Sequence, residues 1–225
     1  RYGGGIGDEG RDMLRVGAAA EWQRSWITNQ GLLIESEAGV TADLYRIWDD
    51  PDYPDPIVRT RPFGQILLRY PLRRDTPNAN VLLEPVLALG WSDVSGGELP
   101  NEDSSRPEFD AGNLFSLNRF PGNDAVEQGL QATAGLNWTR HGRSGSASRL
   151  TFGRVYREEA ALDFTNSSGL KGTRSDWLVA GQYNTGSGLS FEGRALLDNS
   201  LDFTTAAANV RWQDATVSLD ASYIW

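Results

Sequence analysis

The feature that most constrains this chain is an alternation of apolar and polar residues that recurs along most of its 225 residues. Near the start, for example, Leu14, Val16 and Ala18 share one parity while Arg15 and Glu21 take the other. Side chains that alternate with a period of two indicate β-strands. The pattern therefore predicts an all-β fold, an antiparallel meander of about ten long strands. The expected strands are 13–27, 32–44, 65–72, 81–91, 130–139, 148–156, 175–183, 189–197, 202–212 and 217–225.

The lengths of these strands and of their connections favour a membrane barrel. Several strands run to roughly 9–13 residues, and a tilted strand needs about 9–11 to cross a bilayer. Connections at 29–31, 73–79, 142–145 and 185–188 are short, whereas those at 49–61 and 94–127 are long and acidic. Short turns at one end and long loops at the other are typical of outer-membrane barrels. A soluble β-sandwich, which also alternates, remains the competing interpretation.

Aromatic residues near the strand ends support the same interpretation. Membrane barrels carry aromatic girdles at the level of the lipid headgroups. The residues with this placement are Trp22, Trp26, Trp48, Trp91, Trp138, Trp177, Trp212, Tyr223 and Trp225.

Composition excludes several other classes of protein. The formal net charge of −9 argues against nucleic acid as a partner, because a phosphate-binding surface needs clustered basic residues. The chain has no cysteine, so disulfides and thiolate metal sites are excluded. The sequence contains no run of about 18 apolar residues, so it does not predict a transmembrane helix. The chain opens without Met or an apolar leader, which we interpret as a mature piece or a fragment.

The candidate catalytic motifs carry little weight. Residues 5–10 fit GxGxxG by letter, but the motif needs a preceding strand and a following helix. His141, with Ser144 and Ser146 nearby, lies in a glycine- and serine-rich turn that holds catalytic geometry poorly. Adjacent glutamates at 158 and 159 point to opposite faces of a strand and cannot form a facing acid–base pair. We therefore expect no enzyme and no cofactor.

Two further features have simple structural interpretations. Four aspartates at 49–55 predict a solvated loop, with a calcium site as the alternative, although the spacing lacks the EF-hand order. No metal site is predicted. Pro85 lies inside an apolar strand and should mark a weak point in the pairing, because proline donates no ladder hydrogen bond.

The long loop at 100–122 contains an unusual apolar stretch, Leu114-Phe115-Ser116-Leu117, closed by Phe120-Pro121-Gly122. Exposed loops are usually polar, since water satisfies their backbone groups. An apolar stretch inside one predicts that the loop folds back onto another part of the molecule. A large barrel cannot fill its lumen with wall side chains alone, so the lumen is one destination. A cap over the barrel mouth is the alternative.

Several segments together resemble one known family. The residues that carry the resemblance are 65–72 (QILLRYPL), 83–86 (LEPV), 100–104 (PNEDS), 108–110 (EFD), 113–122 (NLFSLNRFPG), 175–180 (SDWLVA) and 221–225 (ASYIW). Their order is similar to that of the LPS-assembly protein D family of Gram-negative outer membranes, in an α-proteobacterial style.

The resemblance implies a lipopolysaccharide-transport barrel in the bacterial outer membrane. It implies that residues 1–225 form part of a large transmembrane barrel with an inserted loop at about 94–127. On this resemblance, the N-terminal periplasmic jelly roll and the remaining strands are expected to lie outside this chain. Lipopolysaccharide, a plug lipoprotein of the transport system and outer-membrane lipids are the implied partners. The alternatives are another outer-membrane barrel, such as a porin or receptor, and a soluble carbohydrate-binding sandwich.

On this resemblance the loop carries the site residues, as a possible contact with the lumen wall or the plug. They are Asn101, Glu102, Asp103, Ser104, Asn113, Leu114, Phe115, Ser116, Leu117, Asn118, Arg119, Phe120, Pro121 and Gly122. Arg119 and the loop carboxylates Glu102, Asp103, Glu108 and Asp110 are expected to pair with wall residues.

Overall fold

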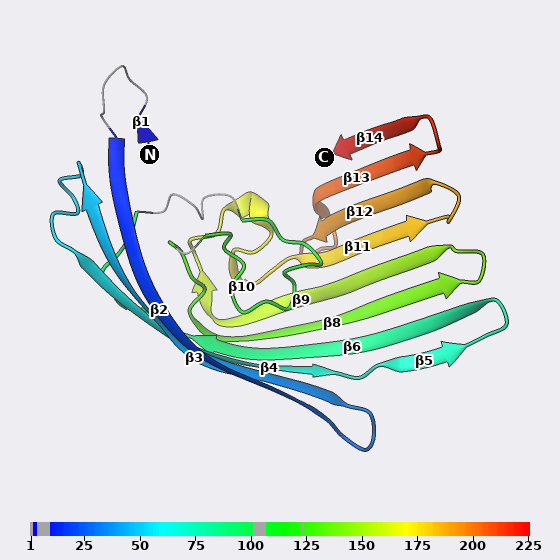
Figure 1. Cartoon of the computed structure of the whole chain (residues 1–225), viewed down its shortest axis with the longest axis horizontal. Coiled ribbons are helices and arrows are strands. Elements are labelled where there is room, and N and C mark those ends of the chain that lie inside the picture. The colour runs from blue at the N-terminus through cyan, green and yellow to red at the C-terminus, as the bar shows by residue number, and fades with distance from the viewer. Residues whose placement is uncertain (1, 4–9, 101–106, 123) are drawn as a thin grey trace.

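A computed structural model describes residues 2–3, 10–100, 107–122 and 124–225 of the chain. The described residues form one antiparallel sheet in which long neighbouring strands follow each other in sequence (Figure 1). The long strands are β2 (Gly10–Ile27), β3 (Leu33–Trp48), β4 (Ile57–Arg69), β6 (Ala79–Ser92), β8 (Gly129–Gly142), β9 (Ala147–Ala161), β11 (Trp177–Asn184), β12 (Leu189–Leu197), β13 (Phe203–Gln213) and β14 (Ser218–Ile224). Four short strands join them: β1 (Tyr2–Gly3), β5 (Leu72–Asp75), β7 (Ser95–Gly96) and β10 (Gly172–Arg174).

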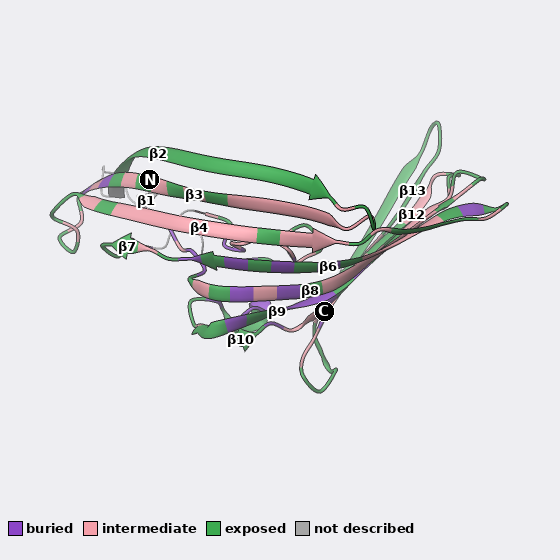
Figure 2. Ribbon diagram, turned by 90° about the horizontal axis from the view of Figure 1, so that it is seen from below, coloured by how far each residue is buried: buried purple, intermediate pink, exposed green. Residues whose placement is uncertain are grey.

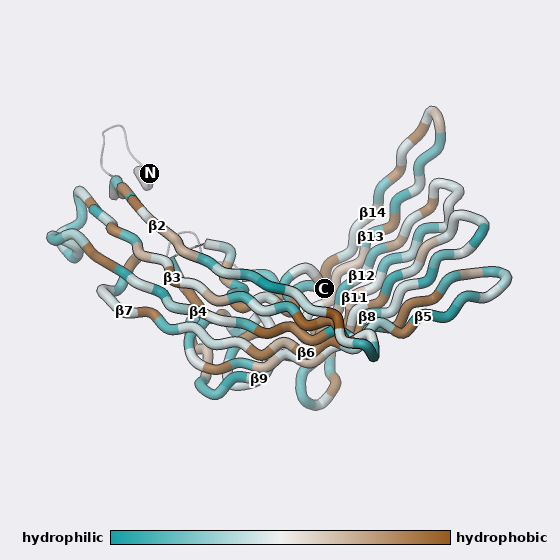
Figure 3. Tube along the Cα trace, turned by 60° about the horizontal axis from the view of Figure 1, so that its bottom comes forward, coloured by the Kyte–Doolittle hydropathy of each residue, from teal (hydrophilic) through white to brown (hydrophobic). Residues whose placement is uncertain are grey.

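The sheet curves into a trough, and its two faces differ in polarity. Residues 107–122 of the loop between β7 and β8 and the short helix η1 (Asn166–Ser168) lie within the trough (Figure 1). On β8, Leu130 and Leu136 point to the convex face, while Gln131, Thr133 and Asn137 point to the concave face. Figure 3 shows that the other strands also carry both hydrophobic and hydrophilic residues along their length. The convex face is therefore mainly apolar, as in a membrane barrel, whereas the concave face combines polar wall residues with a buried apolar cluster.

The aromatic residues gather toward both ends of the convex face. At the end with the long connections, the rings of Phe203 and Trp225 lie 6.4 Å apart, measured between centroids. At the end with the short turns, the rings of Tyr183 and Phe191 are also 6.4 Å apart. Trp22 and Trp26 lie at this end too, on β2. This is the arrangement of two girdles that the sequence predicts.

Burial is concentrated on the middle strands of the sheet. Buried residues follow β6, β8 and β9, whereas β2 and β13 are largely exposed (Figure 2). The core cluster lies on the concave side and combines strand residues with loop residues. Its members are Phe109, Leu114, Phe120, Val155, Phe164, Leu170, Leu178 and Leu196.

All ten predicted long strands are present, but several predicted boundaries are wrong. The segment 73–79 is not simply a turn, because Leu72–Asp75 pairs with β6 as β5. The predicted loop 49–61 is shorter, since β4 begins at Ile57. The connection 162–176, which the sequence analysis did not single out, contains η1 and β10.

Pro85 lies where a ladder is interrupted. Pairing between β4 and β6 ends at Arg69 and Val86, and pairing between β5 and β6 resumes at Leu72. A single hydrogen bond from Tyr70 N to Pro85 O spans the gap. The position is a weak point in the pairing on this side of β6, as predicted.

Among the described residues, no helix is long and apolar enough to cross a membrane.

Candidate functional site

The apolar stretch of the long loop is presented by a tight turn. The Asp110 Oδ1 atom accepts hydrogen bonds from the backbone N–H groups of Gly112 (2.7 Å) and Asn113 (3.1 Å). Asn113 Oδ1 in turn accepts one from Asp110 N at 3.0 Å. Side chains of Asp and Asn that bond nearby backbone fix such turns. The residues that follow, from Leu114 onward, are thereby directed onto the sheet.

Three side chains of the loop lie on three strand glycines, which we call the glycine seats. The seats are Gly90 on β6, Gly135 on β8 and Gly153 on β9. A Cβ atom at Gly135 would lie 2.7 Å from Phe115 Cζ, and one at Gly153 would lie 2.7 Å from Leu114 Cδ2. A Cβ atom at Gly90 would overlap Leu117 Cδ1. Each apolar side chain therefore occupies space that any residue other than glycine would fill.

The glycine seats also lie close to neighbouring backbone. A Cβ atom at Gly135 would be 2.8 Å from Phe152 O, and one at Gly153 would be 2.8 Å from Ala134 O. Gly135 and Gly153 are direct partners across β8 and β9. The absent Cβ atoms let adjacent strands approach on the concave side, so the same glycines serve curvature and docking.

Side chains of the concave face bind the loop backbone between these contacts. Gln65 Nε2 on β4 donates to Phe115 O at 2.8 Å, and Gln131 Nε2 on β8 donates to Leu117 O at 2.5 Å. Buried backbone carbonyls need such partners, because water does not reach them. The docked segment, which we define as residues 107–122, is thus held by polar bonds as well as by apolar packing.

A buried charge cluster fixes the end of the docked segment. Glu127 accepts from Arg119 Nη1 at 2.9 Å and from Arg157 Nε at 2.6 Å, and all three side chains are at least 98 % covered. Arg119 also donates to Gln131 Oε1 (2.7 Å) and Thr133 Oγ1 (3.0 Å) on β8. Burial lowers the pKa of Arg119 from its ordinary value, and Glu127 opposes that shift. Glu127 therefore joins Arg119 of the loop to Arg157 of β9, and Arg119 itself joins the loop to β8.

A second connection, 162–176, completes the packing. The Phe164 ring stacks on Phe120 with centroids 4.1 Å apart and planes at 7°. Arg157 lies 5.4 Å from the Phe164 centroid and donates to Leu170 O at 3.0 Å. Two connections from the same end of the sheet therefore pack together on its concave face.

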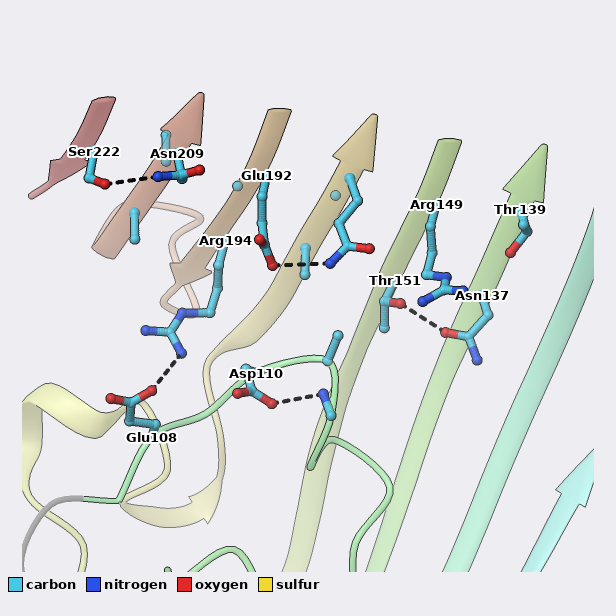
Figure 4. Close-up of a pocket in the computed structure, with 18 of the residues that line it drawn as sticks. Glu108, Asp110, Asn137, Thr139, Arg149, Thr151, Glu192, Arg194, Asn209 and Ser222 are labelled. Carbon is cyan, nitrogen blue, oxygen red and sulfur yellow. Dashed lines mark hydrogen bonds and ion pairs between the residues drawn. The ribbon is translucent and has the colours of Figure 1, made fainter. Parts of the chain in front are cut away.

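Below the docked segment the concave face stays open as a polar cleft of about 810 Å³. The side chains from the strands are spaced along it, with Glu108 and Asp110 of the loop on one side (Figure 4). Glu108 lies 3.7 Å from Arg194, and Gln182 bonds Glu192 at 3.0 Å. The strand residues that Figure 4 labels in this cleft are Asn137, Thr139, Arg149, Thr151, Glu192, Arg194, Asn209 and Ser222.

The predicted site residues fall into four groups. Leu114, Arg119 and Phe120 are buried, and the others from 113 to 118 and Gly122 are half-buried. Pro121 is exposed. Asn101, Glu102, Asp103 and Ser104 lie outside the described residues. Arg119 does pair with wall residues, whereas Asp110 bonds within its own turn.

Several residues that hold the docked segment were missed. They are the three glycine seats, Gln65, Gln131, Glu127 and Arg157. One signal could have found the seats, because a glycine at a polar-face position inside a strand marks a close approach of other atoms.

The weak catalytic candidates gain no support. GxGxxG lies almost entirely outside the described residues. None of the hydrogen bonds of the described residues joins His141 to Ser144 or Ser146. Across the described part of the chain, no group of three or more His, Asp or Glu is placed to hold a metal ion.

Residues 7–225 match the model of a family described as LptD, LPS transport system D. A comparison with curated proteins found no match.

Proposed function

Since this chain belongs to the LptD family of LPS transport, we propose that its concave face lines a barrel lumen and that the docked segment closes part of it. The protein acts in LPS transport and assembly at the bacterial outer membrane, and it is not an enzyme. The curved sheet is a segment of the outer-membrane barrel of this family.

The observation that carries the proposal is the seating of Leu114, Phe115 and Leu117 on the glycine seats. A barrel of many strands encloses more space than its wall side chains fill. A loop whose apolar residues interlock with the wall seals that space at the end with the long connections. The charge cluster around Glu127 fixes the seal in one position.

The polar cleft has a different role in this proposal. Its open, mixed-charge wall suits a polar occupant that exchanges water for side-chain hydrogen bonds. We assign it to the contact with the plug lipoprotein or with the sugar portion of LPS. The resemblance implies both partners. The assignment is supported by the concave face itself, which is covered by the docked segment at one end and open as a cleft at the other.

The test is ion conductance of the full-length protein, with its plug lipoprotein, in planar bilayers. The variant carries Leu114→Ala, Phe115→Ala and Leu117→Ala together, and the control carries Asp52→Asn and Asp55→Asn in the exposed β3–β4 loop. We expect frequent large channel openings in the triple variant only, because its loop no longer has the apolar side chains that occupy the glycine seats. Equal conductance in all three proteins, with equal heat-modifiable gel mobility, would remove the sealing role.

A further inference from the structure

The convex face carries a buried cation that the lumen account does not use. Arg154 lies on β9 opposite Ala134, with the same parity as Phe152 and Tyr156, and is 5 % exposed. Its Nε atom donates to Ser175 O at 2.6 Å, and its Nη2 atom donates to Asn199 Oδ1. Its Nη1 atom has no hydrogen-bond partner among the described residues.

Arg154 differs from the other buried arginines in lacking a carboxylate. Arg119 and Arg157 share Glu127 on the concave face. Arg154 forms no ion pair with any described residue. A buried charge without a counter-ion is costly, and more so beside hydrocarbon.

Aromatic rings surround this guanidinium and compensate only part of its charge. Its Cζ atom lies 5.1 Å from the Trp177 ring centroid and 5.9 Å from that of Tyr156. Phe152 stacks on Trp177 with centroids 4.9 Å apart. Cation–π contacts stabilise an arginine without neutralising it. The aromatic contacts therefore leave the guanidinium charge without a counter-ion among the described residues.

A second arginine stands beside the first on the same face. Arg174 of β10 pairs directly with Tyr156, so its side chain points to the convex side. It is exposed, and its side chain has no hydrogen bond or ion pair with a described residue. The nearest acid of the same parity on β9 is Glu158, which is exposed and pairs with neither arginine. Neither arginine of this patch therefore has a carboxylate partner among the described residues.

From these contacts we infer that Arg154 and Arg174 bind the phosphate group of an anionic lipid in the outer leaflet, between Tyr156 and Trp177. The inference rests on the proposed function, because a concave face that lines a lumen leaves the convex face in lipid. Outer-membrane barrels carry their longer loops on the outside of the cell, which puts the patch near the outer leaflet. The fork of an arginine guanidinium matches phosphate oxygens, and basic residues at a membrane surface attract anionic headgroups. The lipid is either a phosphorylated glycolipid or an anionic glycerophospholipid.

The test measures lipid binding to the full-length complex by native mass spectrometry. The probes are lipid A with its phosphates, dephosphorylated lipid A and phosphatidylglycerol. The variants are Arg154→Gln and Arg174→Gln. The control is Arg24→Gln, because Arg24 also lies over a convex-face tryptophan, 5.4 Å from the Trp26 ring, but at the opposite end of the sheet.

We expect Arg154→Gln to weaken binding of the phosphorylated probe about tenfold and Arg174→Gln about fivefold. Arg24→Gln should leave that binding unchanged. The ratio between lipid A and phosphatidylglycerol identifies which phosphate source the site prefers. Arg174 is exposed, so its variant tests the site even where Arg154→Gln does not fold.

Equal affinities in the wild type and both variants would overturn the inference, as would equal binding of the dephosphorylated probe. Failure of the proposed function gives a different result. If the convex face did not lie in lipid, the wild-type protein would retain none of the three probes.

Discussion

Strand β8 has two halves that share one concave face but differ in what covers them. Toward the long connections, Gln131 and Thr133 are buried beneath the docked segment. Toward the short turns, Asn137 and Thr139 line the open cleft. Gly135 lies between the two halves and seats Phe115. The change from covered to open wall therefore occurs within one strand.

Strand β9 repeats this change beside β8. Val155 and Arg157 are buried by the loops, whereas Arg149 faces the cleft and Thr151 bonds Asn137 at 3.0 Å. Gly153 lies at the boundary, opposite Gly135. Both halves alternate in the same way, so alternation alone does not decide which half is sealed. The covered half is distinguished by its glycines and by polar side chains that bind the backbone of the docked segment.

The largest expected effect comes from removing the shared carboxylate of the sealed half. Glu127→Gln leaves Arg119 and Arg157 buried without a counter-ion, which costs about 3–5 kcal/mol. Hydrogen exchange of the amides of residues 113–119 measures the free energy of local opening. Glu159→Gln, an exposed change two residues beyond Arg157, is the control. Unchanged exchange in Glu127→Gln would show that the cluster does not hold the loop.

A smaller loss is expected from the apolar contacts. Leu114 is fully covered, so Leu114→Ala should destabilise the docked segment by about 2–5 kcal/mol. Leu117→Ala should cost less, because Leu117 is only half-buried. The same exchange experiment compares the two. If Leu117→Ala cost more, the seat on β6 would outweigh the seat on β9.

A glycine seat should respond to a single added methyl group. Gly135→Ala places a Cβ atom within 2.8 Å of both Phe115 Cζ and Phe152 O, and overpacking of this kind costs about 1–3 kcal/mol. In Gly64→Ala on β4 the nearest atom would be 3.6 Å away, an ordinary contact. Urea unfolding of the full-length protein compares the two variants. Equal midpoints would mean that Gly135 is not a seat.

The concave face outside the docked segment should tolerate the loss of an exposed ion pair between β13 and β14. Arg211 and Asp220 are 3.1 Å apart, and their side chains are 59 % and 44 % exposed. Exposed pairs contribute little to stability, so Arg211→Gln should barely shift the urea midpoint. A shift as large as that of Gly135→Ala would show that the covered and open parts of the concave face do not differ as described.

The sequence predicts the sheet better than the site. Alternation around Leu130 and Gln131 identifies a strand and its two faces, because period two is a local property. It does not predict that Gln131 binds Leu117 O, since that contact depends on where a distant loop folds. The apolar stretch predicts that the loop docks somewhere. Phe164, in the connection 162–176, does not belong to an apolar stretch of this kind. Its stacking on Phe120 depends on tertiary packing, which the local sequence does not predict.

The most direct test of the central claim is photo-crosslinking at two phenylalanines on opposite faces of the same strands. Phe115 lies over Gly135 on the concave face, and Phe152 lies on the convex face with 43 % exposure. In intact cells, a photoreactive residue at 115 should crosslink to peptides of β8 or β9, or to the plug lipoprotein, and one at 152 should crosslink to lipid. Labelling of position 115 by a membrane-impermeant reagent, without protein crosslinks, would contradict the account.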